Sequence, residues 1–389
     1  MPAKTCPPLP ISDAPKPVAG GLTLQHIFLI TGGACVLLTA VISRFLVFKH
    51  LHRYTFPEEQ RQIVRVVVTP IWFSVAALFS IAWYDAALYV QPVGYIYEAF
   101  ALAALFLLFV HYVAPDPQTR EAFFFNLPML DRKGKETGKG CLGMFKRMWV
   151  IVFLYPPLTL GFYVVQWITL ATGKYCSNSN SPHFGHFWVT LLTNVITTFA
   201  VTAVIRFYGR LKKPMASHKP LWKLVSFKLI VFFNFIQSLI FSFVSGNKSV
   251  QAKMGAKFTF DDLSIGLPNL LICIEQVLLA LMMHFTFRSR EYHSNNGRTR
   301  MSTWRAFLDS FNLSDIFIAI ARIPVMLAGG SSNARSRTFE GYEANKLGSD
   351  AEPMTDFAAP PAGTAGNMPQ RTYWSAQDRE DKHSVILEP

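Results

Sequence analysis

The sequence contains little charge and few cysteines, and common catalytic motifs are missing from it. Only 16% of its 389 residues are charged, against about a quarter in soluble domains. The five cysteines form no close pair and no CxxC motif, so neither a zinc site nor a disulfide framework is predicted. There is also no Gly-rich phosphate loop, HExxH motif or GxSxG turn. We therefore expect no enzymatic activity, no cofactor and no metal site.

The apolar residues, which make up 51% of the chain, are gathered into seven blocks of about twenty residues. That length spans the hydrocarbon core of a bilayer. Each block is expected to be a helix, because within lipid the backbone N–H and C=O groups must bond inside the segment. The sequence thus predicts an all-α, polytopic membrane protein with seven transmembrane helices in residues 24–287. The predicted spans are 24–43, 63–84, 93–113, 149–171, 186–205, 221–244 and 267–287.

The basic residues are distributed unequally between the two sides of this predicted bundle. Twenty-one Lys and Arg residues fall in loops on one side and six on the other. By the positive-inside rule the N-terminus is outside or lumenal and the C-terminus is cytosolic, as an odd number of spans also requires. The net charge of +13 is therefore attributed to a membrane surface, and no nucleic acid is expected as a partner.

The segments outside the predicted spans suggest three further elements. Residues 1–23 are rich in proline, lack the pattern of a secretory signal and are predicted to be a disordered lead. Residues 303–327 mix apolar and charged side chains, which favours one amphipathic juxtamembrane helix on the cytosolic leaflet. Residues 328–389 have the composition of a disordered cytosolic tail.

Two sites of modification follow from local patterns. The sequon at Asn247 lies in a predicted lumenal loop and can accept a glycan. Cys141 lies in the basic third loop, where it is either palmitoylated or an unmodified thiol.

Five polar residues within the predicted spans are candidates for a solute path: Glu98, Lys228, Asn234, Gln237 and Glu275. Polar and ionisable groups are costly inside a membrane and therefore raise a functional question. At 1.5 Å per residue, Lys228 and Glu275 reach similar depths and can pair, while Glu98 and Gln237 can share an outer polar pocket. The alternative is that these residues only hold helices together. Both interpretations stay open at this point.

Two further ionisable residues lie near the predicted cytosolic boundary. Arg65 is interpreted as a side chain that extends toward the interface, and His284 as an interfacial residue rather than a ligand.

Five motifs occur in a fixed order within residues 24–320. They are Phe56-Pro-Glu-Glu-Gln-Arg-Gln-Ile-Val-Arg65 before Pro70, Tyr97-Glu98-Ala-Phe100, Phe227-Lys228-Leu-Ile-Val-Phe232 with Gln237, Ile274-Glu275 with His284, and Phe311-Asn-Leu-Ser-Asp315-Ile316. Together they resemble the organic solute transporter alpha-subunit and transmembrane protein 184 family, in its fungal-type branch. The resemblance implies a seven-span fold and facilitated transport of steroid-like or other amphipathic organic anions.

The resemblance also implies partners and a location. The expected partners are membrane lipid, a small organic solute, and either a single-span partner subunit or a second copy of the chain. Fungal relatives favour the vacuolar membrane over the plasma membrane. The alternative function is a scaffold in that membrane whose tail recruits a ubiquitin-like autophagy protein. The aromatic candidates for such a contact are Phe339, Tyr342, Tyr373 and Trp374.

Overall fold

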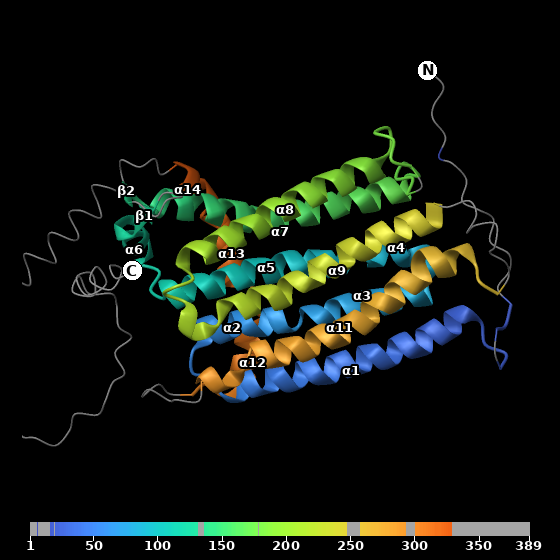
Figure 1. Ribbon diagram of the computed structural model, residues 1–389, viewed down its shortest axis with the longest axis horizontal. Helices are drawn as coiled ribbons and strands as arrows, with labels where there is room; N and C mark the ends of the chain where they lie inside the picture. The colour runs from blue at the N-terminus through green and yellow to red at the C-terminus, as the bar shows by residue number, and fades with distance from the viewer. Residues whose placement is uncertain are drawn as a thin grey trace, which may run out of the picture.

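Long helices lie side by side and run alternately in opposite directions (Figure 1). The computed structural model describes residues 6, 16–18, 20–130, 136–177, 179–246, 257–292 and 300–328, with several side chains of 230–246 left out. The longest helices are α1 (Leu24–His52), α5 (Pro92–Val113), α7 (Leu142–Ala171), α8 (Gly185–Leu211), α9 (Pro220–Gly246) and α11 (Leu267–Thr286). The predicted all-α class is confirmed. A short antiparallel hairpin, β1 (Pro128–Leu130) with β2 (Glu136–Gly140), interrupts it in the third loop.

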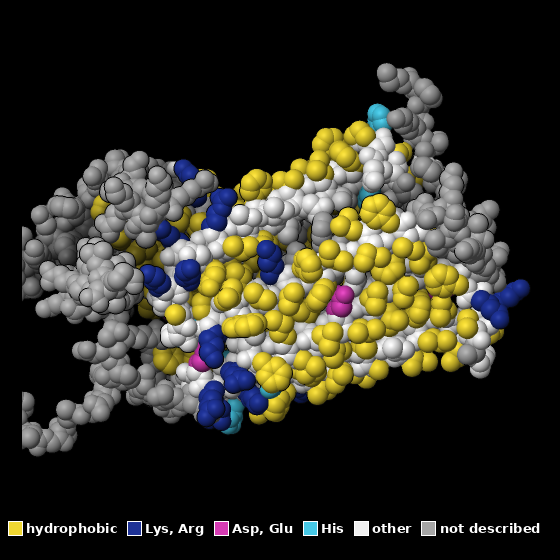
Figure 2. Space-filling model, in the orientation of Figure 1, with side chains coloured by type: hydrophobic (Ala, Val, Ile, Leu, Met, Phe, Trp, Pro, Cys, Tyr) yellow, Lys and Arg dark blue, Asp and Glu magenta, His cyan; other side chains and the backbone are white. Residues whose placement is uncertain are grey.

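Seven of the described segments are long and apolar enough to cross a membrane. Six of them overlap predicted spans, and the seventh is Thr303–Leu327. The remaining predicted span, 221–244, is α9, a helix of 27 residues. On the face shown in Figure 2, apolar side chains cover the middle of the molecule, with few charged side chains among them. The prediction of a multi-pass membrane protein with seven helices of spanning length is therefore confirmed.

The second predicted span consists of two helices rather than one. α2 (Pro57–Val67) ends just before α3 (Thr69–Ala82), and Pro70 lies at the start of α3. Proline has no backbone N–H and its ring clashes with the preceding turn, so a break at this position is expected. Pro156 and Pro157, by contrast, lie inside an unbroken α7.

α5 is the central helix of the bundle. Every side chain from Ala101 to Val113 is buried, and α5 packs against α2, α3 and α7. A short 3-10 turn, η1 (Tyr84–Ala86), and α4 (Ala87–Val90) lead into it. α1 and α8 are outer helices, and they expose large apolar side chains such as Leu37 and Phe199. Since both lipid and protein interior are apolar, hydrophobicity alone does not tell which face of such a helix is buried.

The two ends of the bundle differ in chemistry. Lys and Arg side chains gather at the end that carries α6 (Arg120–Asn126) and the β1–β2 hairpin (Figures 1 and 2), which we call the basic end. At the opposite end a disulfide joins Cys6 to Cys176 in the α7–α8 loop, with 5.6 Å between their Cα atoms. The expectation of no disulfide is therefore wrong. We call this the disulfide end. Disulfide bonds persist in oxidising compartments.

The segment after α11 is folded differently from its prediction. Instead of one helix over 303–327, it forms α12 (Thr303–Phe311), α13 (Ser314–Ala321) and α14 (Ile323–Ala328). These helices contact α2, α5 and α7 at the basic end. Their inward side chains are small or aliphatic, whereas Trp304, Leu308, Phe317 and Val325 are exposed. The predicted amphipathic character is present, but it is spread over three short helices, so this segment does not cross the bundle as one span.

Several predicted residues lie outside the described part of the chain. These are the sequon residue Asn247 and the tail residues Phe339, Tyr342, Tyr373 and Trp374. Asn234 lies within α9, but its side chain is outside the described part.

Candidate functional site

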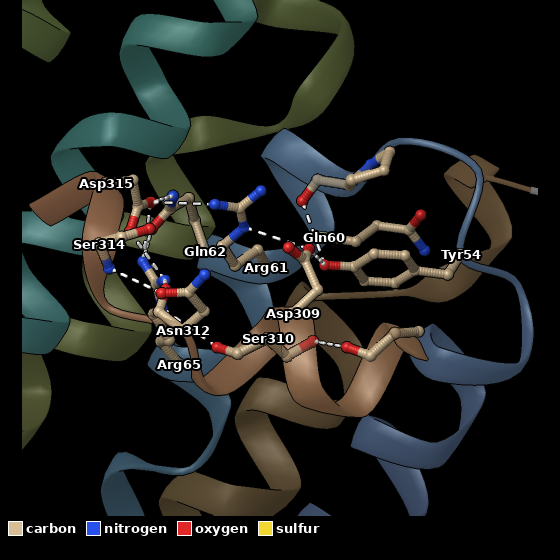
Figure 3. Close-up of polar contacts among 12 residues, drawn as sticks. Tyr54, Gln60, Arg61, Gln62, Arg65, Asp309, Ser310, Asn312, Ser314 and Asp315 are labelled. Carbon is tan, nitrogen blue, oxygen red and sulfur yellow. Dashed lines mark hydrogen bonds and ion pairs between the residues drawn. The ribbon is translucent and has the colours of Figure 1, made fainter. Parts of the chain in front are cut away.

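Arg65 and Asp315 join the start of the second span to the segment after the last one (Figure 3). The guanidinium of Arg65 donates to both carboxylate oxygens, with Nη1 at 2.9 Å from Oδ2 and Nη2 at 2.8 Å from Oδ1. It also donates to the carbonyls of Ser310 and Asn312. Arg65 is only 4% exposed, so the interpretation of Arg65 as an interfacial side chain is wrong. Burial alone would raise the Asp315 pKa, but the bonds and charge of Arg65 outweigh it and hold that pKa below its usual value.

A second ion pair lies one turn earlier on α2. Arg61 Nε donates to Asp309 Oδ2 at 3.2 Å, and the Tyr54 hydroxyl donates to the same oxygen at 2.7 Å. Burial and the bond to Asp309 raise the Tyr54 pKa well above its usual value, so this hydroxyl keeps its proton and acts as a donor. Asp309 of α12 and Asp315 of α13 thus each pair with one arginine of α2.

Gln60 bonds four backbone groups where the chain turns from α1 into α2. Its Oε1 accepts from the amides of Thr55 and Phe56, and its Nε2 donates to the carbonyls of His50 and Arg53. These groups lie at a helix end, where backbone amides and carbonyls have fewer partners than inside a helix. Two motifs that carry the family resemblance meet at the Arg65–Asp315 pair, and together with the Gln60 contacts their geometry is that of a structural clamp.

A buried network around Lys223 lies elsewhere at the basic end. Lys223 is 1% exposed, and its Nζ lies 2.8 Å from the Tyr112 hydroxyl and 3.1 Å from Glu291 Oε2. His218 approaches the same Glu291 oxygen at 3.6 Å and stacks on Tyr112. Sequence reasoning missed Lys223, because nothing in the apolar run around it distinguishes it from Lys228.

Lys228 and Glu275 do not pair in the structure. Lys228 is exposed, whereas Glu275 is half-buried on α11 and lies within reach of Gln237 on α9. The expectation of a Lys228–Glu275 contact is therefore wrong.

The Gln237–Glu275 pair has unused hydrogen-bonding capacity. Both polar atoms of the Gln237 amide, and Oε2 of Glu275, are buried without a hydrogen bond of good geometry in the described part of the chain. Buried polar atoms are usually bonded. This pair is therefore a place where a hydroxyl or carbonyl of a ligand would find both a donor and acceptors.

Glu98 has surroundings of its own on α5. It is 4% exposed and interacts electrostatically with Tyr95 and with Tyr155 and Tyr163 of α7. No hydrogen bond or ion pair to Glu98 is found within the described residues. Gln237 faces α11 instead, so the structure does not bring these two residues into the single outer pocket that we expected.

A groove opens at the basic end of the seam between α9 and α11. It encloses about 580 Å³, and its lining includes Lys219 and Trp222 on the α9 side and Met282, Phe285, Arg288 and Arg290 on the α11 side. Among the described residues, Lys219, Arg288 and Arg290 have no acidic partner, and the one acid of the lining, Glu291, is paired with Lys223. The groove therefore combines aromatic walls with unneutralised positive charge.

The groove and the Gln237–Glu275 pair lie along the same side of α11. Glu275 and Met282 are seven residues apart, which places them on one face of a helix and about 10 Å apart along its axis. A cationic opening at the basic end is thus followed, deeper in the bundle, by polar atoms without partners. We call the groove lining together with Gln237 and Glu275 the α9–α11 seam.

A second cavity lies on the other side of α11, against α1. It encloses about 360 Å³ and includes Leu46, Lys49, Arg53 and His284, together with the shared Phe285, Arg288 and Arg290. Among the residues that the structure describes, no acidic side chain lines it. His284, one of the predicted boundary residues, lines this cavity at the basic end, where its ring stacks on Phe45.

Metal binding is not indicated by the described residues, which contain no cluster of three or more His, Cys, Asp or Glu side chains suited to an ion.

Comparison with known proteins points to one family. The sequence model described as "Organic solute transporter Ostalpha" matches residues 28–292. Protein LAZ1 of Arabidopsis thaliana is 24% identical over 283 residues, which cover 67% of this chain and 57% of that protein. The chain thus matches less than two thirds of the length of this relative. No solved structure matches.

Proposed function

Because the chain belongs to the organic solute transporter Ostalpha family, we propose that it carries amphipathic organic anions across the membrane along the α9–α11 seam. At the coarser level, it is a transporter-like integral membrane protein with seven helices of spanning length. The family is one of transporters and not of enzymes. The single observation that carries the finer proposal is the α9–α11 groove, where positive charge without acidic partners borders aromatic walls.

The chemistry of the groove favours a solute with one apolar body and one negative group. Trp222 and Phe285 offer flat apolar surfaces, and Met282 adds a flexible one. A sulfate or carboxylate would lie beside Lys219, Arg288 and Arg290, where it replaces a missing counter-charge. A steroid-like anion has this combination of groups.

The Gln237–Glu275 pair, farther along the seam, offers hydrogen-bonding groups to a solute that moves inward from the groove. Gln237 can donate and accept, and Glu275 Oε2 can accept. A solute hydroxyl or carbonyl that leaves water would recover hydrogen bonds there, which lowers the cost of its passage. Glu98, in its tyrosine surroundings on α5, stays a candidate whose role in the path is untested.

The decisive experiment is uptake into vesicles that contain the purified protein. A labelled steroid sulfate is expected to enter faster than into empty vesicles, and faster than the uncharged parent steroid enters through the protein. Lys219→Gln and Gln237→Leu should each lower the uptake rate at equal protein content, by about 5- to 30-fold if each removes about 1–2 kcal/mol of favourable contact. Uptake equal to that of empty vesicles across a broad panel of organic anions would contradict the proposal.

Lys228→Gln is the matched control for Lys219→Gln. It removes the same charge from the same helix, but Lys228 does not line the groove. We expect its uptake rate to equal that of the unaltered protein. A loss as large as that of Lys219→Gln would show that the charge of the surface, rather than the α9–α11 groove, governs uptake.

The location, orientation and partners are also proposals. We place the protein in the vacuolar membrane with the basic end in the cytosol, a position that agrees with a disulfide on the opposite side. A fluorescent tag followed in living cells tests the membrane. Crosslinking in native membranes tests for a single-span partner subunit or a second copy. The scaffold function of the tail concerns residues outside the described part and remains a prediction, which a pull-down with the full chain and with a chain that ends at residue 328 would test.

A further inference from the structure

The cavity between α1 and α11 differs from the α9–α11 groove in its charge. Its basic side chains come from the ends of two helices: Lys49 from the last turn of α1 and Arg53 just after it, and His284 from the last turn of α11 and Arg288 just after it. Arg290 completes the lining. Within the described chain, Lys49, Arg288 and Arg290 have no acidic partner, and no acid lies among the residues around the cavity.

The contacts inside the cavity hold these charges close together. The ammonium of Lys49 lies 4.1 Å from the centroid of the Phe45 ring, and that ring stacks on His284 at 5.7 Å. Lys49 and Arg288 both interact electrostatically with His284. Lys49 and Arg288 thus both lie near the His284 ring, and because like charges repel, an anion that enters the cavity would stabilise this arrangement.

The position of the cavity favours an anion that belongs to the membrane. It lies at the basic end, beside the outer helix α1, and Phe45 and Phe285 at its rim are 52% and 62% exposed. Leu278 and Leu281, farther along α11 toward the centre of the membrane, are also exposed. An acyl chain would lie on these apolar side chains while its headgroup occupied the cavity.

We propose that the cavity between α1 and α11 binds the phosphate-bearing headgroup of an anionic phospholipid from the leaflet at the basic end. The charge of the cavity selects a phosphate with additional negative charge over a zwitterionic headgroup. Its volume of about 360 Å³ is within the usual range of pockets for small molecules, about 300–1,000 Å³. Arg288 and Arg290 line both this cavity and the α9–α11 groove, so bound lipid would also change the charge that a solute meets there.

The test is direct lipid binding to the full-length protein in nanodiscs of phosphatidylcholine. The probe is a fluorescent short-chain phosphatidylinositol 4-phosphate, with phosphatidylcholine of the same chains and free inositol phosphate as competitors. We expect the anionic lipid to compete strongly, the phosphatidylcholine weakly, and the free headgroup weakly because it lacks the acyl contact. Competition by free inositol phosphate as strong as that of the whole lipid would overturn the assignment to a membrane lipid.

Two single-charge variants separate this cavity from the neighbouring groove. Lys49 lines only the α1–α11 cavity, and Lys219 lines only the α9–α11 groove. Lys49→Gln should weaken lipid binding about five-fold, the effect of one basic residue at an anionic surface, whereas Lys219→Gln should leave it unchanged. Equal weakening by both variants, or none by Lys49→Gln, would overturn the proposal. Since binding is measured without transport, failure of the proposed transport function would not alter this result.

Discussion

Lys223 is buried beside Glu291, with 3.1 Å between Nζ and Oε2, whereas Lys228, five residues later on the same helix, is exposed. The two lysines share a helix and an apolar sequence environment. Their surroundings nevertheless differ, because five residues turn a helix by about 500° and so to a different face. This contrast gives the first prediction.

Lys223→Met is expected to lower the free energy of unfolding by about 1.5–3 kcal/mol, since it removes the charge-assisted hydrogen bond from Lys223 to Glu291, whose side chain is 28% exposed. Lys228→Met should change it by less than about 0.5 kcal/mol, as for other exposed positions. Thermal unfolding of the purified proteins in one detergent measures both. Equal destabilisation by the two variants would contradict the burial of Lys223.

The Arg65–Asp315 ion pair leads to a second prediction. Asp315→Leu alone should destabilise the protein by about 2–4 kcal/mol, because the buried guanidinium of Arg65 loses its carboxylate. Combining it with Arg65→Met should recover part of that loss, as both charges are then absent. Hydrogen exchange at the amides of α12 and α13 reports the loss of this ion pair locally. We expect faster exchange in the Asp315→Leu variant than in the unaltered protein.

This ion pair also has an expected pH dependence. Since the Asp315 pKa is below its usual value in the folded protein, its stabilising effect is fully present at neutral pH and is lost as the pH falls through that lowered pKa. Asp315→Leu should therefore be least harmful in acid. A stability difference that stays constant down to acidic pH would show that the carboxylate charge is not involved.

Gln60 is the subject of the third prediction. Gln60→Met keeps the size of the side chain but removes its four bonds to backbone groups, and it should cost about 2–4 kcal/mol of stability. Gln25→Met is the matched control, because Gln25 is half-buried and donates to the carbonyls of Ile81 and Ala82 only. Thermal unfolding should rank Gln60→Met clearly below Gln25→Met, and the reverse order would contradict the clamp at the α1–α2 turn.

The Cys6–Cys176 disulfide gives a test of orientation. After reduction, a membrane-impermeant maleimide added from the non-cytosolic side should label Cys6 and Cys176. A cysteine introduced by Lys212→Cys, at the basic end after α8, should react only from the cytosolic side. Cys6→Ser should make Cys176 reactive without any reductant. Labelling of both ends from one side would refute the proposed orientation.

The sequence predicted what depends on long runs of residues. The seven predicted apolar blocks correspond to helices of the structure, because a segment that crosses lipid must be apolar over about that length and must pair its own backbone groups. The division of the second span into α2 and α3 next to Pro70 was not predicted. The family resemblance likewise agrees with the matched family over residues 28–292.

The sequence could not predict which face of each helix is buried. Arg65 and Asp315 are 250 residues apart, and nothing near either residue in the sequence indicates the other. Lys228 was a candidate because of its depth in the span and Lys223 was not considered, yet depth says nothing about the direction a side chain takes. Cys6 and Cys176, separated by 170 positions, resemble two isolated thiols until the fold places them together.

The distance along the chain between Arg65 and its partner also bears on how the protein is made. Translation reaches Arg65 early, yet Asp315 is synthesised only after every spanning helix. Until then the guanidinium at the start of the second helix pair has no carboxylate to satisfy it. A chain that ends between residues 292 and 315 would therefore contain every long helix and still leave Arg65 without its carboxylate partner. The packing at the start of the second span thus depends on a residue that is made after all the long helices.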